Sequence, residues 1–150
     1  DRSIDAFGLS NFTTSTGARH TRYLSAASPE ADLTLIANIV YMVNVQNTQT
    51  LIVTLPASPQ TGDVVRMIDV GGNLKYDTTL VLRTPETSGT PIQGDSTGTL
   101  FGDRLTPYPS GELVVQTPNA AFALVYLGAV DSNDQIGIPT SVQGWWLMEV

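Results

Sequence analysis

Two pairs of aspartates are the residues of this chain whose type and spacing could support chemistry. Asp63 and Asp69 lie at the two ends of one expected strand, and Asp95 and Asp103 lie in a segment rich in Gly and Thr. Hydrolysis of a glycosidic bond uses two carboxyl groups about 5 to 9.5 Å apart in a groove. These pairs are therefore the candidates for an enzymatic activity, and each must be compared with a structural explanation.

Turns explain the first pair better than catalysis does. Asp63 follows Gly62, where a carboxylate accepts hydrogen bonds that close a loop. Asp69 comes just before Gly71 and Gly72, so we expect it to accept hydrogen bonds from the amides of that turn.

Other catalytic and ligand-binding patterns are incomplete. The only histidine, His20, has no acidic neighbour to orient it, and no Gly-x-Ser-x-Gly elbow is present. The run 131–134, DSND, has oxygen ligands but lacks the glycine and the distant glutamate of a calcium loop. We therefore expect no enzymatic activity, no cofactor and no metal site.

Composition restricts the class of protein further. The chain of 150 residues is long enough for one domain and contains no cysteine, which fits assembly in a reducing cytoplasm. Its 14 acidic and 7 basic residues give a net charge of -7, which argues against a nucleic-acid partner. No apolar run reaches the about 18 to 20 residues that span a bilayer, and we expect no signal peptide.

The order of apolar runs and turn residues predicts an all-β fold. Eight short runs with β-branched residues are separated by Pro, Gly, Asn and Asp, which is typical of an antiparallel β-sandwich or barrel. The runs are Leu33–Ala37, Ile39–Val45, Thr50–Leu55, Val64–Val70, Thr79–Arg83, Leu113–Thr117, Ala121–Leu127 and Trp145–Val150. We expect a β domain over residues 31–150, in which the third and fourth runs form a hairpin.

Residues 1–30 are predicted to form an extended amino-terminal arm. The segment lacks a sustained period, although Ser3–Phe7 and Arg19–Leu24 could be short strands. It is either a linker or edge arm, or a segment that inserts into a neighbouring subunit. The linker or edge arm is the preferred interpretation, and Phe7, Leu9 and Phe12 are the reason to retain insertion, because apolar side chains on a loose arm require a partner surface.

Two of the runs are apolar on both faces. Ile39–Val45 and Ala121–Leu127 would expose one apolar row each if only one face of their sheet were covered. They are either central strands or part of a subunit interface, and we favour the interface.

The adjacent Trp145 and Trp146 must point to opposite sides of a strand. We expect Trp146, which shares its side with Met148 and Val150, to be buried. Trp145 would then be exposed and free to stack on a sugar or to fill a partner's pocket.

Read in order, the loop signals between these strands resemble those of a known β domain. The residues that carry the resemblance are Asp32-Leu33-Thr34-Leu35 before a Tyr41 strand, Thr54-Leu55-Pro56 with Gly62-Asp63, Asp69 with Gly71-Gly72-Asn73, and Phe122, Leu124, Val125 and Tyr126 ahead of Trp145-Trp146. This domain recurs in tail-fibre and baseplate proteins of tailed bacteriophages, including baseplate wedge proteins of T-even-like phages. The segment Gly94–Ser110 is longer than the corresponding loop of that family.

The resemblance implies a structural protein of the virion, assembled in the host cytoplasm and placed in the tail, baseplate or fibre. Such domains usually bind copies of themselves, often as trimers, and other virion proteins. The interface residues we predict are apolar groups among small polar ones, namely Phe7, Phe12, Phe101, Tyr108 and Trp145. The alternatives are a carbohydrate- or receptor-binding module for host attachment, which could bind a surface glycan, and a head-decoration or head-fibre protein.

Overall fold

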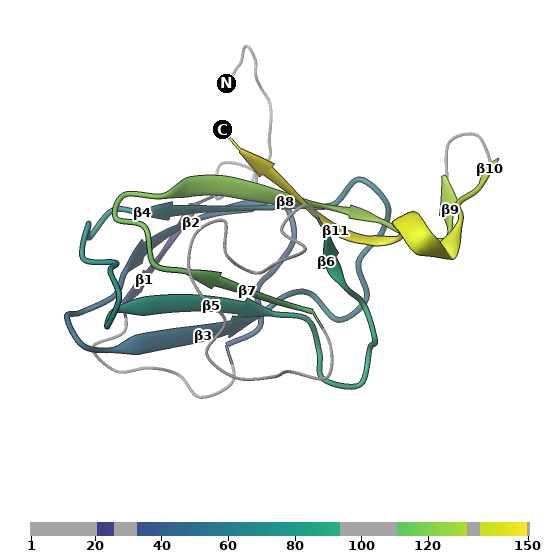
Figure 1. Ribbon diagram of the computed structural model, residues 1–150. Coiled ribbons are helices and arrows are strands. Elements are labelled where there is room, and N and C mark those ends of the chain that lie inside the picture. The colour runs from purple at the N-terminus through teal and green to yellow at the C-terminus, as the bar shows by residue number, and fades with distance from the viewer. Residues whose placement is uncertain (1–20, 26–32, 94–110, 132–135, 150) are drawn as a thin grey trace, which may run out of the picture.

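The computed structural model (Figure 1) describes residues 21–25, 33–93, 111–131 and 136–149, and the regular secondary structure in these ranges is almost entirely β-strand. The strands are β1 (Thr21–Ser25), β2 (Ile39–Asn44), β3 (Thr50–Thr54), β4 (Val64–Asp69), β5 (Thr79–Arg83), β6 (Ile92–Gln93), β7 (Glu112–Val115), β8 (Ala121–Leu127), β9 (Val130–Asp131), β10 (Ile136–Gly137) and β11 (Gly144–Glu149). One 3-10 turn, η2 (Thr140–Val142), precedes β11. The prediction of an all-β fold is confirmed.

Two sheets pack face to face. The larger sheet has the strand order β1-β2-β4-β8-β11-β6, and the smaller has the order β3-β5-β7. In Figure 1 they form the upper and lower layers, while the two-stranded ribbon of β9 and β10 projects from one end. The described part of the chain is therefore a sandwich of a six-stranded sheet and a three-stranded sheet.

Both large sheets are mixed, so the antiparallel pairing predicted from the sequence holds for only some of the strand pairs. Strand β2 pairs in parallel with β1 and β4, and β3 pairs in parallel with β5. Parallel neighbours cannot be joined by a tight turn and require a crossover. Here the crossover is a strand of the opposite sheet: β3 lies between β2 and β4 in sequence, and β4 lies between β3 and β5.

The predicted hairpin of the third and fourth runs is consequently absent, because β3 and β4 belong to different sheets. The connecting loop changes sheets within a few residues. The amide of Leu55 still donates to Arg83 of β5 (2.7 Å), whereas the amide of Gly62 already donates to Tyr126 of β8 (2.9 Å). Pro56 and Pro59 interrupt pairing as expected, but they do so on a path across the sandwich.

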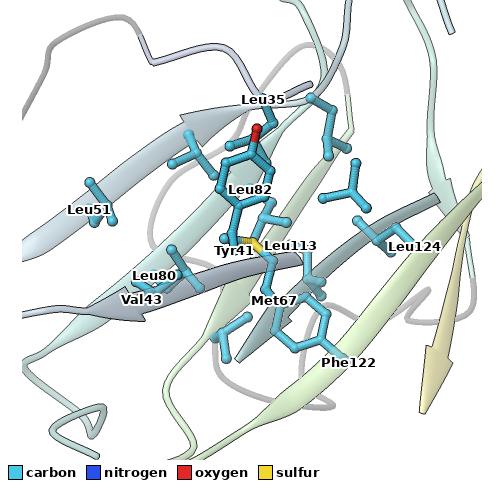
Figure 2. Packing of buried hydrophobic residues seen from close by; sticks show 14 of the residues in the cluster. Leu35, Tyr41, Val43, Leu51, Met67, Leu80, Leu82, Leu113, Phe122 and Leu124 are labelled. Atoms are coloured by element: carbon cyan, nitrogen blue, oxygen red, sulfur yellow. The ribbon is translucent and has the colours of Figure 1, made fainter. Parts of the chain in front are cut away.

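Alternation along the strands supplies the core between the sheets. Figure 2 shows Tyr41, Met67 and Phe122 of the larger sheet packed with leucines of the smaller sheet. The inward-facing side chains are buried, and they include Leu51, Val53, Leu55, Leu80, Leu82, Phe122 and Leu124. The hydroxyl of the buried Tyr41 accepts a hydrogen bond from the amide of Ile36 (2.7 Å), so its polar atom is satisfied.

The amino-terminal part of the predicted β domain differs from expectation. Leu33–Ala37 is not a regular strand and makes a single bridge, from Thr34 to Thr54. The short strand considered at Arg19–Leu24 within the predicted arm is present as β1, which lies at the edge of the larger sheet with Leu24 buried in the core. Among the described residues, Leu33 and Leu35 form backbone hydrogen bonds only with Thr54 at the end of β3, whereas β1 pairs with β2 along its whole length.

Candidate functional site

The larger sheet has an apolar side that faces away from the core, which we call the outer face. Tyr41, Val65, Phe122 and Trp145 point into the core, so the residues that alternate with them point outward. Strand register arranges the outward residues in three rows. The rows are Tyr23-Met42-Ile68-Ala121, Thr21-Val40-Arg66-Ala123-Met148 and Val64-Val125-Trp146-Gln93.

Large apolar side chains on this face are partly or largely exposed. The exposed fraction is 60% for Tyr23 and 37% for Met148, and Met42, Ile68 and Trp146 are half-buried. Tyr, Trp, Met and Arg are the residue types enriched at the centre of protein-protein interfaces, where Lys, Asp and Glu are depleted. The outer face has that composition over five neighbouring strands.

Arg66 is the charged residue of these rows. It lies on β4 in the second of the three rows, between Val40 of β2 and Ala123 of β8. Its side chain is exposed. The ion pairs among the residues that the structure describes are Lys75–Asp77 and Arg83–Glu112, so Arg66 has no carboxylate partner within that part of the chain.

The tryptophan assignment is reversed from the prediction. Trp145 is 1% exposed and packs on Tyr126, with ring centroids 5.3 Å apart at 56°, whereas Trp146 is half-buried on the outer face. The indole N–H of Trp146 donates to the carbonyl of Val142 (2.8 Å). Trp145 is therefore a core residue and was wrong as a predicted interface residue, because its strand pairs it directly with Tyr126, on the inner side.

The candidate catalytic aspartates on β4 serve turns, as expected. A carboxylate oxygen of Asp63 accepts from the amide of Gln60 (2.9 Å) and closes the loop. The buried Asp69 accepts from the amides of Gly72 (3.1 Å) and Asn119 (2.9 Å), and so joins two turns at one end of the sandwich. Their side chains are occupied in holding loops together.

A buried ion pair on the smaller sheet is the other concentration of charge. The Nε of Arg83 donates to a carboxylate oxygen of Glu112 at 2.8 Å, and these residues face each other directly across β5 and β7. The glutamate is almost fully buried. This geometry fixes the register of two strands.

Several predicted residues fall outside the residues that the structure describes. These are the predicted interface residues Phe7, Phe12, Phe101 and Tyr108, together with His20, Asp95, Asp103 and the run 132–134. In the described ranges, no three His, Asp or Glu side chains gather closely enough to hold a metal ion.

Sequence reasoning found the outer face only in part. It identified both two-faced strands, but it missed Tyr23 and Arg66. The signal for Arg66 was present in the sequence, because a single arginine stands between Val64 and Ile68 on one side of an otherwise apolar strand. Tyr23 could not be assigned until β1 was seen to pair with β2.

No protein-family model matches the chain, and no curated protein matches it. Within the described residues, no helix is long and apolar enough to cross a membrane.

Proposed function

We propose that this chain is a structural component of a tailed-bacteriophage virion, in the tail, baseplate or fibre, that works by binding rather than by catalysis. Its partners are copies of itself, as a trimer, and other virion proteins. The order of loop signals along the sequence supports the phage part of the proposal. The outer face of the larger sheet is the observation that supports the binding part.

The size of the outer face suits an interface. Five strands about 4.8 Å apart and three rows about 7 Å apart cover roughly 20 Å by 20 Å, or about 400 Å². The exposed apolar area is smaller than this footprint, which includes the buried Ala123 and the polar Thr21, Arg66 and Gln93. A standard interface buries about 800 Å² per partner, so the outer face would supply the apolar centre and the surrounding loops its polar rim.

The composition of the outer face also favours protein over sugar as the ligand. A glycan-binding module was attractive while Trp145 was expected to be exposed, but that ring is buried in the core. Sugar platforms combine an aromatic ring with converging polar groups, whereas the neighbours of the half-buried Trp146 in its row are Val125 and Gln93. The outer face offers mainly apolar contact, which is the chemistry of protein assembly.

The test is the composition of purified virus particles that are made with this chain. Mass spectrometry of particles washed in high salt should find the chain in a fixed copy number per particle, because apolar contacts persist when surface charges are screened. A chain that is absent from intact particles, or that is removed by the salt wash, would contradict the proposal.

A further inference from the structure

The unpaired Arg66 restricts how the outer face can be covered. Its guanidinium is exposed at the centre of an apolar surface and has no carboxylate partner among the residues that the structure describes. Burying an unpaired charge in an interface is costly, and an arginine is well suited to a bidentate pair with a carboxylate. The surface that covers the outer face should therefore carry an acidic group.

A two-fold dimer of outer faces does not meet this requirement. In an isologous contact each patch meets its own copy. None of the outward residues in the three rows is acidic, so a second outer face cannot supply the carboxylate, and a contact centred on Arg66 would bring the two guanidinium groups together. Like charges that are placed together in this way oppose association.

The rest of the same chain contains an excess of acidic residues. The chain has 14 acidic residues against 7 basic ones, and none of the outward positions in the three rows is acidic. Outside these rows the chain therefore has 14 acidic residues against 6 basic ones, an excess of charge opposite in sign to Arg66.

We propose that the outer face binds a second copy of this chain head to tail, with a carboxylate from a different surface of that copy paired to Arg66. This inference rests on the proposed function, and it specifies the geometry of self-assembly. A head-to-tail contact closes into a ring when its rotation allows, and a three-membered ring is one such closed form.

Sedimentation equilibrium of the full chain tests the role of Arg66. Arg66→Glu should raise the dissociation constant of self-association about 30-fold or more, since loss of a buried charge pair at an interface has at least this effect. Lys75→Glu is the matched control, because Lys75 lies in a loop with 48% of its side chain exposed and the charge change is identical. Arg66→Gln, which adds no negative charge, should also weaken association, and circular dichroism checks that each variant is folded.

A single thiol tests the geometry of the contact. The chain has no cysteine, so Ala121→Cys places one reactive group in an exposed position of the outer face. Maleimide labelling of this thiol should be slow in the associated protein and fast in the Arg66→Glu background. Oxidation should not produce a disulfide-linked dimer.

Four results would overturn the inference. The first two are a monomeric chain whose thiol at position 121 reacts freely, and a monomeric chain whose thiol is protected by the chain itself. The third is an equal effect of Arg66→Glu and Lys75→Glu on the dissociation constant. The fourth is rapid formation of a disulfide between two outer faces. A monomeric chain that is still found in particles would reject this contact and leave the proposed function standing. A self-associating chain that is absent from particles would reject the proposed function instead.

Discussion

Truncation of the two adjacent tryptophans should have very different effects on stability. Trp145 is 1% exposed and packs on Tyr126, whereas Trp146 is half-buried on the outer face. Burial of about 200 Å² by a tryptophan, at about 25 cal/mol per Å², gives an upper estimate of about 5 kcal/mol. Trp145→Ala should therefore reduce the free energy of unfolding by about 3 to 5 kcal/mol, as large core truncations do.

Trp146→Ala is the matched comparison on the same strand. It removes a partly exposed ring and one hydrogen bond, from the indole N–H to the carbonyl of Val142, and should cost about 1 to 2 kcal/mol. The assay is urea unfolding followed by far-ultraviolet circular dichroism, which does not depend on tryptophan emission. Chain concentrations should be low, so that self-association does not add to stability.

The comparison of these two variants tests the orientation of β11 and therefore of the outer face. If Trp146→Ala costs as much as Trp145→Ala or more, β11 presents its other side to the core. The arrangement of the outer-face rows would then be wrong on that strand.

Three further substitutions test the turns and the strand connections, each by the same unfolding assay. Gly71→Ala should cost about 1 to 3 kcal/mol, because the added methyl group would collide with Asn44, whereas Gly137→Ala meets open space and should be nearly neutral. Asp69→Asn should cost about 1.5 to 3 kcal/mol, since an amide cannot replace a carboxylate that accepts from two backbone amides; an unchanged midpoint would show that this turn contact is unimportant. Thr84→Val keeps the shape of the side chain but removes a hydroxyl that accepts from the buried amide of Gly111, so a cost of about 1 to 3 kcal/mol is expected, and no loss would contradict the role given to that bond.

Strand positions could be predicted from the sequence because they depend on local alternation. In β3 the buried residues alternate with exposed ones as period two predicts, whereas Thr79–Leu82 of β5 are buried on both faces. A short run beside Pro or Gly is sufficient to locate such strands. The all-β character of the fold follows from these local signals.

Strand pairing could not be predicted, because the same loop residues serve a hairpin and a crossover. Pro56, Pro59 and Gly62 stop pairing in either case, and only long-range contacts decide which sheet the next strand joins. For a related reason, the sequence did not determine which of the two tryptophans faces the core. Period two fixes that Trp145 and Trp146 are opposed, but the partner strand β8 decides which of them faces inward.

The candidate surface was only partly predictable for the same physical reason. The apolar rows of β2 and β8 are visible in the sequence, but a surface forms only when strands distant in sequence are placed side by side. Tyr23 reaches the outer face through the parallel pairing of β1 with β2, and Arg66 becomes its centre only once β4 lies between β2 and β8.

The most direct test of the central claim, that the outer face is an assembly surface, is the solution mass of the full chain by light scattering. Met148 on the outer face and Ile52 on the smaller sheet have nearly equal exposed fractions, 37% and 38%, so Met148→Glu and Ile52→Glu form a matched pair. The wild-type chain and Ile52→Glu should have at least twice the monomer mass of 16.0 kDa. Met148→Glu should have the mass of a monomer. If Met148→Glu keeps the wild-type mass, or if the wild-type chain is itself a monomer at every concentration, the outer face is not the surface through which this chain assembles with its copies.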